Sequence, residues 1–190
     1  APMQVDVTLR PVASRANRAG QVQTAPGLTL PATFTGTVPM VSGPGVRWHL
    51  DLWPDQVYHL EQIYGDGDGA YDRGRWRADP ARDAIVLRGG REAPVLLEIL
   101  EGGDLRLMNP EGGPIESDLP YNLTAGPLTP VEDVQFLTGM LRYLADAAVF
   151  VECLTGRSYP VAMEGAYTDA ERAYLRLEDR EPGAPVLTLL

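Results

Sequence analysis

Apolar and polar residues alternate without a break between positions 46 and 52. One face of an extended strand here would carry Val46, Trp48, Leu50 and Leu52. The opposite face would carry Arg47, His49 and Asp51. This period of two is typical of an antiparallel strand with one face in a core and the other toward water. The stretch therefore favours a β fold, and the rest of the chain has to supply partner strands.

Strand-like runs flank this stretch on both sides. Residues 30–38 precede it across a loop of proline and glycine, and residues 57–64 follow it after a three-residue turn. Such a turn would pair Trp53 with Val57 and give its last residue, Gln56, a positive φ. Glycine favours that conformation, so a glutamine costs about 1 kcal/mol there. The runs predict antiparallel neighbours on both edges of the central strand.

Further short strands are expected at regular spacing, at residues 74–78, 84–87, 95–100, 105–109 and 121–124. Turns rich in glycine or proline separate them, at residues 79–80, 89–90, 102–103 and 111–113. Many short strands joined by hairpin turns are typical of an up-and-down antiparallel barrel. Residues 30–126 are therefore predicted to form one.

The composition changes after this barrel, where two prolines fall within residues 126–130. Strands are expected beyond them at residues 137–144, 149–153, 158–163 and 185–190. One helix is predicted over 168–177, with Thr168 as its N-cap and Glu171 completing a capping box.

The N-terminal residues alternate over 3–10 as a short strand and then become small and polar, as in a flexible connector. The predicted fold class is mainly β. The predicted domains are an N-terminal strand and connector (1–29), the barrel (30–126) and a small β domain with one helix (127–190).

The charge of the chain limits its partners. It carries 16 Lys and Arg against 26 Asp and Glu, a net charge of -10, whereas nucleic-acid binding needs clustered basic residues. We therefore expect no nucleic-acid partner and no attraction to an anionic membrane surface. No apolar run reaches the length of about 18 residues needed to span a bilayer. A single cysteine, Cys153, excludes an intrachain disulfide and a multi-thiolate zinc site.

The polar face of the hairpin gathers possible metal ligands. In the register set by the turn, Asp51 would face His59, and His49 would face Glu61. Opposed residues have Cβ atoms about 5 Å apart, and imidazole and carboxylate groups are ligands for Zn(II) and Cu(II). One interpretation is a metal site on these four residues. The other is a solvated sheet face with favourable cross-strand charge pairs, which needs no metal.

The barrel interior offers a second possible site, for a small hydrophobic ligand. Its expected lining is Trp48, Leu50, Leu52, Tyr58 and Leu60. Eight-stranded barrels either fill their interior with side chains or hold one small ligand. Catalysis is not expected, because Cys153 has no histidine near it in the sequence and both histidines fall in the other domain. No cofactor is expected, apart from the copper or zinc of the metal interpretation.

The sequence contains, in this order, the stretches LPATFTGTVPMVSGPGVRWHLDLWPD, GRWRADPARDAIVLRGG, LRLMNPEGGPIESDLPYNLT and LTGMLRYLADAAVFVECLTGRSYPVAMEGAYTDAERAYL. Together they resemble the NlpE family of envelope lipoproteins, also called copper resistance or copper homeostasis proteins. The resemblance implies a lipocalin-like barrel followed by an OB-like domain. It also implies a non-enzymatic periplasmic protein, tethered to the outer membrane by a lipid anchor not visible in this sequence. The implied role is copper tolerance and envelope-stress sensing through a sensor kinase of the Cpx type.

One feature of the family is missing. Its members commonly carry a C-x-x-C pair in the loop after the first barrel strand, and here Met40 and Gly43 occupy the two positions. A lone thioether is a poor site for Cu(I), so thiol-based copper binding does not carry over. Family members also continue beyond the segment matching residues 185–190, so the second domain is expected to be shortened. Residues 3–10 are the candidate strand that completes it, and Cys153, whose family partner lies further on, is expected to be unpaired.

Overall fold

The structure is a computed structural model of the chain that describes residues 3–4, 25–65, 67, 69–131, 137–144, 147–177 and 183–189. This part of the protein is mainly β, as predicted, with strands in two sheets and one helix. The chain divides into two compact units. One contains the described parts of residues 19–132, and the other joins those of residues 133–190 to those of residues 1–18.

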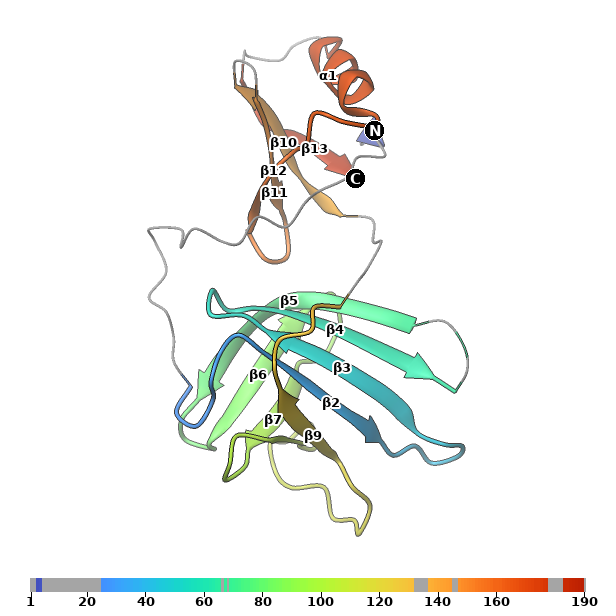
Figure 1. The fold of residues 1–190 in the computed structure, drawn as a ribbon, viewed down its shortest axis with the longest axis vertical. Helices are drawn as coiled ribbons and strands as arrows, with labels where there is room; N and C mark the ends of the chain where they lie inside the picture. Colours follow the sequence, from blue (N-terminus) through green and yellow to red (C-terminus); the bar gives the residue numbers. More distant parts are fainter. Residues whose placement is uncertain are drawn as a thin grey trace. The chain divides into compact units, whose positions relative to one another are not determined.

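The larger unit is a closed barrel of eight antiparallel strands, in which each strand pairs with its neighbours in sequence (Figure 1). The barrel closes because its last strand also pairs with its first, with Phe34 opposite Ala125. The strands are β2 (Ala32–Val38), β3 (Val46–Leu52), β4 (Val57–Tyr64), β5 (Gly69–Asp79), β6 (Ala84–Gly89), β7 (Val95–Ile99), β8 (Leu105–Leu107) and β9 (Asn122–Gly126). The up-and-down antiparallel barrel predicted from the spacing of the turns is thereby confirmed.

The apolar face of β3 lies inside the barrel, as its alternation predicts. Leu50 and Leu52 have no exposed surface, and Trp48 is 6% exposed. They belong to one hydrophobic cluster with buried side chains of the neighbouring strands, including Phe34 and Tyr58. Burying a side chain of this kind stabilises a fold by about 1.5–3 kcal/mol. This cluster is therefore a main source of the stability of the barrel.

The turn between β3 and β4 has the geometry that the sequence predicts. The Trp53 N–H donates to the Val57 carbonyl at 2.9 Å, and the Gln56 N–H donates to the Trp53 carbonyl at 3.1 Å. Gln56 has a φ of 66°, in the left-handed region that glycine adopts most readily. Its carbonyl accepts a hydrogen bond from the Trp76 N–H at 2.8 Å, which holds the turn against β5.

Replacing Gln56 with glycine is expected to stabilise the barrel by about 0.5–1 kcal/mol, because glycine adopts positive φ without steric cost. Urea unfolding followed by tryptophan fluorescence measures the change. Asp83, with a φ of 48°, provides a matched comparison in the turn between β5 and β6. Asp83→Gly should gain less, since aspartate tolerates this region better than glutamine. A loss of stability in Gln56→Gly would contradict the strain assigned to this turn.

Strand β5 is longer than predicted. The sequence indicated only residues 74–78, whereas the strand begins at Gly69. Its first half pairs with β4, with Tyr71 opposite Glu61 and Arg73 opposite His59. The glycine and charged residues of this half have low strand propensity, but a neighbouring strand that supplies the ladder hydrogen bonds overrides such a weak preference.

The smaller unit is a five-stranded sheet with one helix, and its strand order is β1-β13-β10-β11-β12 (Figure 1). Its elements are β1 (Met3–Gln4), β10 (Thr138–Leu144), β11 (Ala147–Glu152), β12 (Ser158–Pro160), α1 (Tyr167–Leu175) and β13 (Val186–Leu189). Leu141 of β10 lies opposite Phe150 of β11. Both side chains form one cluster with Ala170 and Tyr174 of the helix, so this unit has a core of its own.

The N-terminal strand β1 belongs to the second sheet. Met3 and Gln4 pair in parallel with Thr188 and Leu189 of β13, while the other edge of β13 pairs with β10. The prediction that the N-terminal strand completes the C-terminal domain is confirmed for these two residues. Residues 5–10, the rest of that predicted strand, lie outside the described part of the chain.

The predicted N-cap of helix α1 is wrong. The N-cap residue is Ala166, without a side-chain capping bond, and Thr168 lies inside the first turn. Tyr167 packs edge-on against Tyr143 with ring centroids 5.7 Å apart, so packing rather than a capping hydroxyl sets this end. The helix has nine residues, and within the described ranges no helix is long and apolar enough to cross a membrane.

Candidate functional site

The outer face of β3 and β4 places four polar residues in the predicted register. His49 lies opposite Glu61, and Asp51 lies opposite His59. Glu61 accepts a hydrogen bond from the Tyr71 hydroxyl at 2.9 Å. A close approach links His49 to Asp51, with 3.4 Å between Nε2 and Oδ1. The sequence thus predicted the pairing of these residues correctly.

Asp51 was expected to lie on a solvated face, but it has no exposed surface. The segment that leaves the barrel after β9 lies over it. The Thr33 hydroxyl donates to Asp51 Oδ1 at 2.6 Å, and the Val131 N–H donates to Oδ2 at 2.8 Å. The Thr129 N–H donates to Thr33 Oγ1 at 2.8 Å, and the Thr129 carbonyl lies 2.8 Å from His49 Nε2. We call these five residues the Asp51 clamp.

The Asp51 clamp fixes the path of the chain as it leaves the barrel. Both carboxylate oxygens accept hydrogen bonds, which offsets the cost of burying the group. A backbone carbonyl can only accept, so the hydrogen on His49 Nε2 is donated to Thr129. Side chains of β2 and β3 therefore hold the backbone of the exit segment against the barrel.

Of the two interpretations of this outer face, the contacts of its side chains favour the one that needs no metal. In the described part of the chain, no group of three or more His, Cys, Asp and Glu side chains is arranged to hold a metal ion. The Asp51 oxygens and His49 Nε2 are engaged within the clamp, so an ion would have to displace their partners.

Titration calorimetry with Cu(II) and Zn(II) tests this prediction. Because the ligand atoms of His49 and Asp51 are already engaged, we expect no saturable heat from the native chain. Saturable heat that disappears in His49→Ala would instead establish a metal site on this face. Heat of equal size in both proteins would place the ion elsewhere.

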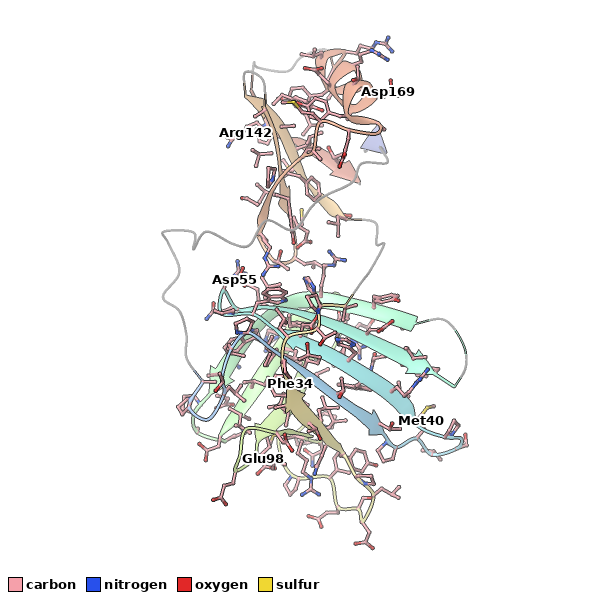
Figure 2. The ribbon with its side chains drawn as sticks, viewed as in Figure 1. Phe34, Met40, Asp55, Glu98, Arg142 and Asp169 are labelled. Atoms are coloured by element: carbon pink, nitrogen blue, oxygen red, sulfur yellow. The ribbon has the colours of Figure 1, made fainter. Side chains whose placement is uncertain are left out.

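The loop between β2 and β3 does not provide a thiolate site for copper. Met40 is 46% exposed, and Gly43, with a φ of 101°, has no side chain to bind a metal. Figure 2 shows Met40 at the opposite end of the barrel strands from Asp55. Cys153 is free and exposed, and it belongs to the smaller unit. Met40 and Gly43 therefore cannot supply the two thiolate ligands of the family C-x-x-C pair.

The barrel interior is filled at the positions predicted to line a ligand cavity. The side chains there have between 0% and 6% of their surface exposed and form one cluster, and they are Trp48, Leu50, Leu52, Tyr58 and Leu60. A cavity wide enough for a solvent molecule would leave exposed surface on the side chains around it. Packing at these five positions thus favours a structural core over a carrier site.

A polar cluster around the buried Asp72 lies beside this core, and the sequence did not predict it. The Tyr58 hydroxyl donates to Asp72 Oδ2 at 2.8 Å, and the Gly90 N–H donates to Oδ1 at 3.0 Å. Arg91 Nε lies 3.1 Å from Asp72 Oδ2, and the Arg91 guanidinium also donates to Gln62. The alternation of β5 would have placed Asp72 inward if the strand had been extended toward its true start. The cluster ties the loop after β6 to β4 and β5.

The Tyr58 hydroxyl is expected to reduce stability at alkaline pH. Burial, followed by the hydrogen bond to the Asp72 carboxylate, raises the pKa of Tyr58 far above its usual value. Above about pH 10 the unfolded chain releases this proton while the folded chain keeps it, so the stability from Tyr58 is complete below that pH and is lost above it.

The expected slope of this loss is about 1.4 kcal/mol per pH unit. Urea unfolding at several pH values between about 8 and 11 measures it. Tyr58→Phe should flatten the decline, because phenylalanine has no proton to release. An equally steep decline in that variant would show that another group causes it.

Two family models match the chain in order along the sequence. The NlpE N-terminal domain matches residues 34–118, and the NlpE C-terminal OB domain matches residues 131–190. The first match begins within β2 and continues past β8 of the barrel, and the second covers β10 to β13 with helix α1.

Individual proteins are similar over much of the same length. Lipoprotein NlpE of Escherichia coli (strain K12) is 29% identical over 154 residues, which are 77% of this chain and 61% of that protein. The crystal structure of the Cpx pathway activator NlpE from Escherichia coli is 26% identical, with a TM-score of 0.40, and covers 83% of this chain and 82% of that one. The crystal structure of a putative lipoprotein from Shewanella oneidensis is 24% identical, with a TM-score of 0.41, and covers 51% of this chain and 89% of that one. The chain thus spans 61% of the length of its curated relative.

Both NlpE domains are therefore present in family order. The barrel carries the N-terminal match, and the smaller sheet with its helix carries the OB match. NlpE proteins are not a known family of enzymes. The chain belongs to the NlpE family.

Proposed function

We propose that this chain is a non-enzymatic periplasmic protein that signals envelope stress by contact with the sensor domain of a Cpx-type kinase. The observation that carries the proposal is the match of both NlpE domains, in order, along the chain. The Escherichia coli relative is a lipoprotein and is described as the activator of the Cpx pathway. By the same relation, the full-length protein would be held at the outer membrane by a lipid anchor.

The barrel supports a role in contact rather than in transport of a ligand. Its core positions Leu50, Leu52 and Leu60 are filled, so the interior at these residues has no room for cargo. The polar groups of the Asp51 clamp form hydrogen bonds with one another, so their role is structural. The exposed outer surface is then the part of the barrel that meets a partner.

Any contribution to copper tolerance would run through the same signalling contact. Thiolate binding is not available in the loop after β2, because Met40 and Gly43 stand at the two positions of the family cysteine pair. A thioether alone is a weak ligand set for Cu(I). We therefore propose a signalling role and no copper-carrying role.

A reporter of Cpx signalling tests the proposal in cells. The chain, fused to a lipoprotein signal and lipidated, is expected to raise the reporter when it is overproduced. The rise should vanish in cells that lack the kinase, which is the matched control. A reporter that stays at its basal level while the lipidated protein accumulates would contradict the proposed function.

A further inference from the structure

The outer face of β5 and β6 carries a cluster of arginines. Arg73, Arg75 and Arg77 occupy alternate positions of β5, and Arg88 of β6 lies directly opposite Arg75. The residues between them on β5, such as Trp76, are buried in the barrel, so the arginines project from its outer side. Arg75, Arg77 and Arg88 are exposed, and Arg73 is half-buried. We call these four residues the arginine face.

This cluster is unusual for the unit that contains it. Residues 19–132 include eight arginines, no lysine and sixteen acidic residues, so the barrel unit has a net charge of -8. Half of its cations are nevertheless gathered on two neighbouring strands. A strongly charged patch on a surface of opposite overall charge is typical of electrostatic recognition rather than of solubility.

Three of the four arginines have no carboxylate partner in the described part of the chain. Like charges directly opposite each other in a sheet are destabilising, and Arg75 stands opposite Arg88. Among the described residues, no carboxylate pairs with Arg75, Arg77 or Arg88, and the one hydrogen bond of Arg75 goes to the Asp55 carbonyl at 3.5 Å. By contrast, Arg82 of the same unit pairs with a carboxylate at 2.7 Å. Arg75, Arg77 and Arg88 therefore keep guanidinium donors available for an external anion.

We propose that the arginine face docks an acidic segment of a protein partner. The planar guanidinium binds carboxylates through two parallel hydrogen bonds. Alternate residues of a strand lie about 6.6 Å apart, close to the spacing of about 5–6 Å between the Cβ atoms of residues one turn apart on a helix. The inference rests on the proposed function in assuming that the chain acts by protein contact, and it adds the surface and the chemistry of the partner.

An acidic segment fits this surface better than an anionic membrane does. Asp79 follows Arg77 at the next outward position of β5, and Asp55 lies at the turn beside Arg75. A flat lipid surface would press against these carboxylates as well as the arginines. A narrow acidic segment can follow the row of arginines alone.

Fluorescence anisotropy of a labelled peptide of ten glutamates tests the proposal at low ionic strength with the full chain. The native chain is expected to bind the peptide, and Arg75→Gln with Arg88→Gln should weaken binding about tenfold. The matched control is Arg47→Gln with Arg142→Gln, which removes the same charge from two exposed arginines outside the face. It should bind like the native chain. The unfolding midpoint of the first variant should not fall, because it removes the opposed pair.

Four results would overturn the proposal that the arginine face docks an acidic segment. They are no binding of the peptide, equal weakening in both variants, tighter binding to phosphatidylglycerol vesicles than to the peptide, and a concentration-dependent dimer that only the Arg75 and Arg88 variant loses. The last two would assign the surface to a membrane or to a second copy of the chain.

A binding assay with the sensor domain of a Cpx-type kinase distinguishes a failure of this inference from a failure of the proposed function. Equal binding of that domain by the native chain and the Arg75 and Arg88 variant overturns the arginine face and leaves the signalling role standing. Binding of the peptide through these arginines, without binding of the sensor domain, contradicts the signalling role and supports the docking surface.

Discussion

Asp51→Ala is expected to lower the free energy of unfolding of the barrel by about 3 kcal/mol. The substitution removes the acceptor of the buried Thr33 hydroxyl and of the part-buried Val131 N–H. The hydroxyl keeps only a longer contact of 3.3 Å with the Thr129 carbonyl. Each unsatisfied buried group costs about 1–3 kcal/mol. Urea unfolding followed by tryptophan fluorescence measures the loss, because Trp48 and Trp76 lie in the barrel core.

Asp118→Ala is the matched control for this change. Asp118 is exposed in the loop before β9, and such surface substitutions change stability by at most about 0.5 kcal/mol. Hydrogen exchange at the Val131 amide gives a second measurement, since losing Asp51 frees that N–H. A loss below about 1 kcal/mol, with unchanged exchange at Val131, would show that the clamp does not hold the exit segment.

Gly89→Ala is expected to destabilise the barrel by more than about 3 kcal/mol. A β-carbon at this position would collide with the Arg73 carbonyl and the Tyr58 hydroxyl and would lie 2.6 Å from Asp72 Oδ1. Gly89 pairs directly with Gly74, so β5 and β6 approach each other where neither has a side chain. The added methyl group would force the strands apart and break the hydrogen bond between Tyr58 and Asp72.

Gly126→Ala is the matched control on β9 of the same barrel. A β-carbon there meets only the Thr33 carbonyl at 3.8 Å, an ordinary van der Waals contact, so the loss should stay below about 1 kcal/mol. Equal losses in the two variants, measured by urea unfolding, would rule out the close approach at Gly89 as the cause.

The register of β3 and β4 could be predicted because two independent constraints agree on it. The alternation of the strand decides which face is buried, and the three-residue turn decides which residues are opposed. His49 opposite Glu61 and the positive φ of Gln56 both follow from those constraints. Local sequence was sufficient here because both strands and the turn are contiguous.

The burial of Asp51 could not be predicted in the same way. The alternation of a strand predicts which residues share a face, but it does not predict which part of the chain covers that face. The cover comes from Val131, which is 80 residues further along the chain. The polar cluster around Asp72 could not be predicted for the same reason, because its partner Arg91 lies in the loop after β6.

In the second domain, one prediction from local sequence is confirmed and another is wrong. The alternation at the N-terminus predicted a strand that would complete the domain, and Met3 and Gln4 pair with β13. The cap of helix α1 was predicted from Thr168 by local pattern alone. The contact of Tyr167 with Tyr143 starts the helix one residue earlier, which is a case of packing overriding a capping preference.

Binding of the full chain to the periplasmic sensor domain of a Cpx-type kinase tests the central claim most directly. Isothermal titration calorimetry of the two purified proteins measures it without a membrane or a reporter. The signalling role predicts saturable binding with a Kd of about 100 μM or tighter, a free energy of about -5.5 kcal/mol or more favourable. No saturable heat at higher concentrations of both proteins would contradict it.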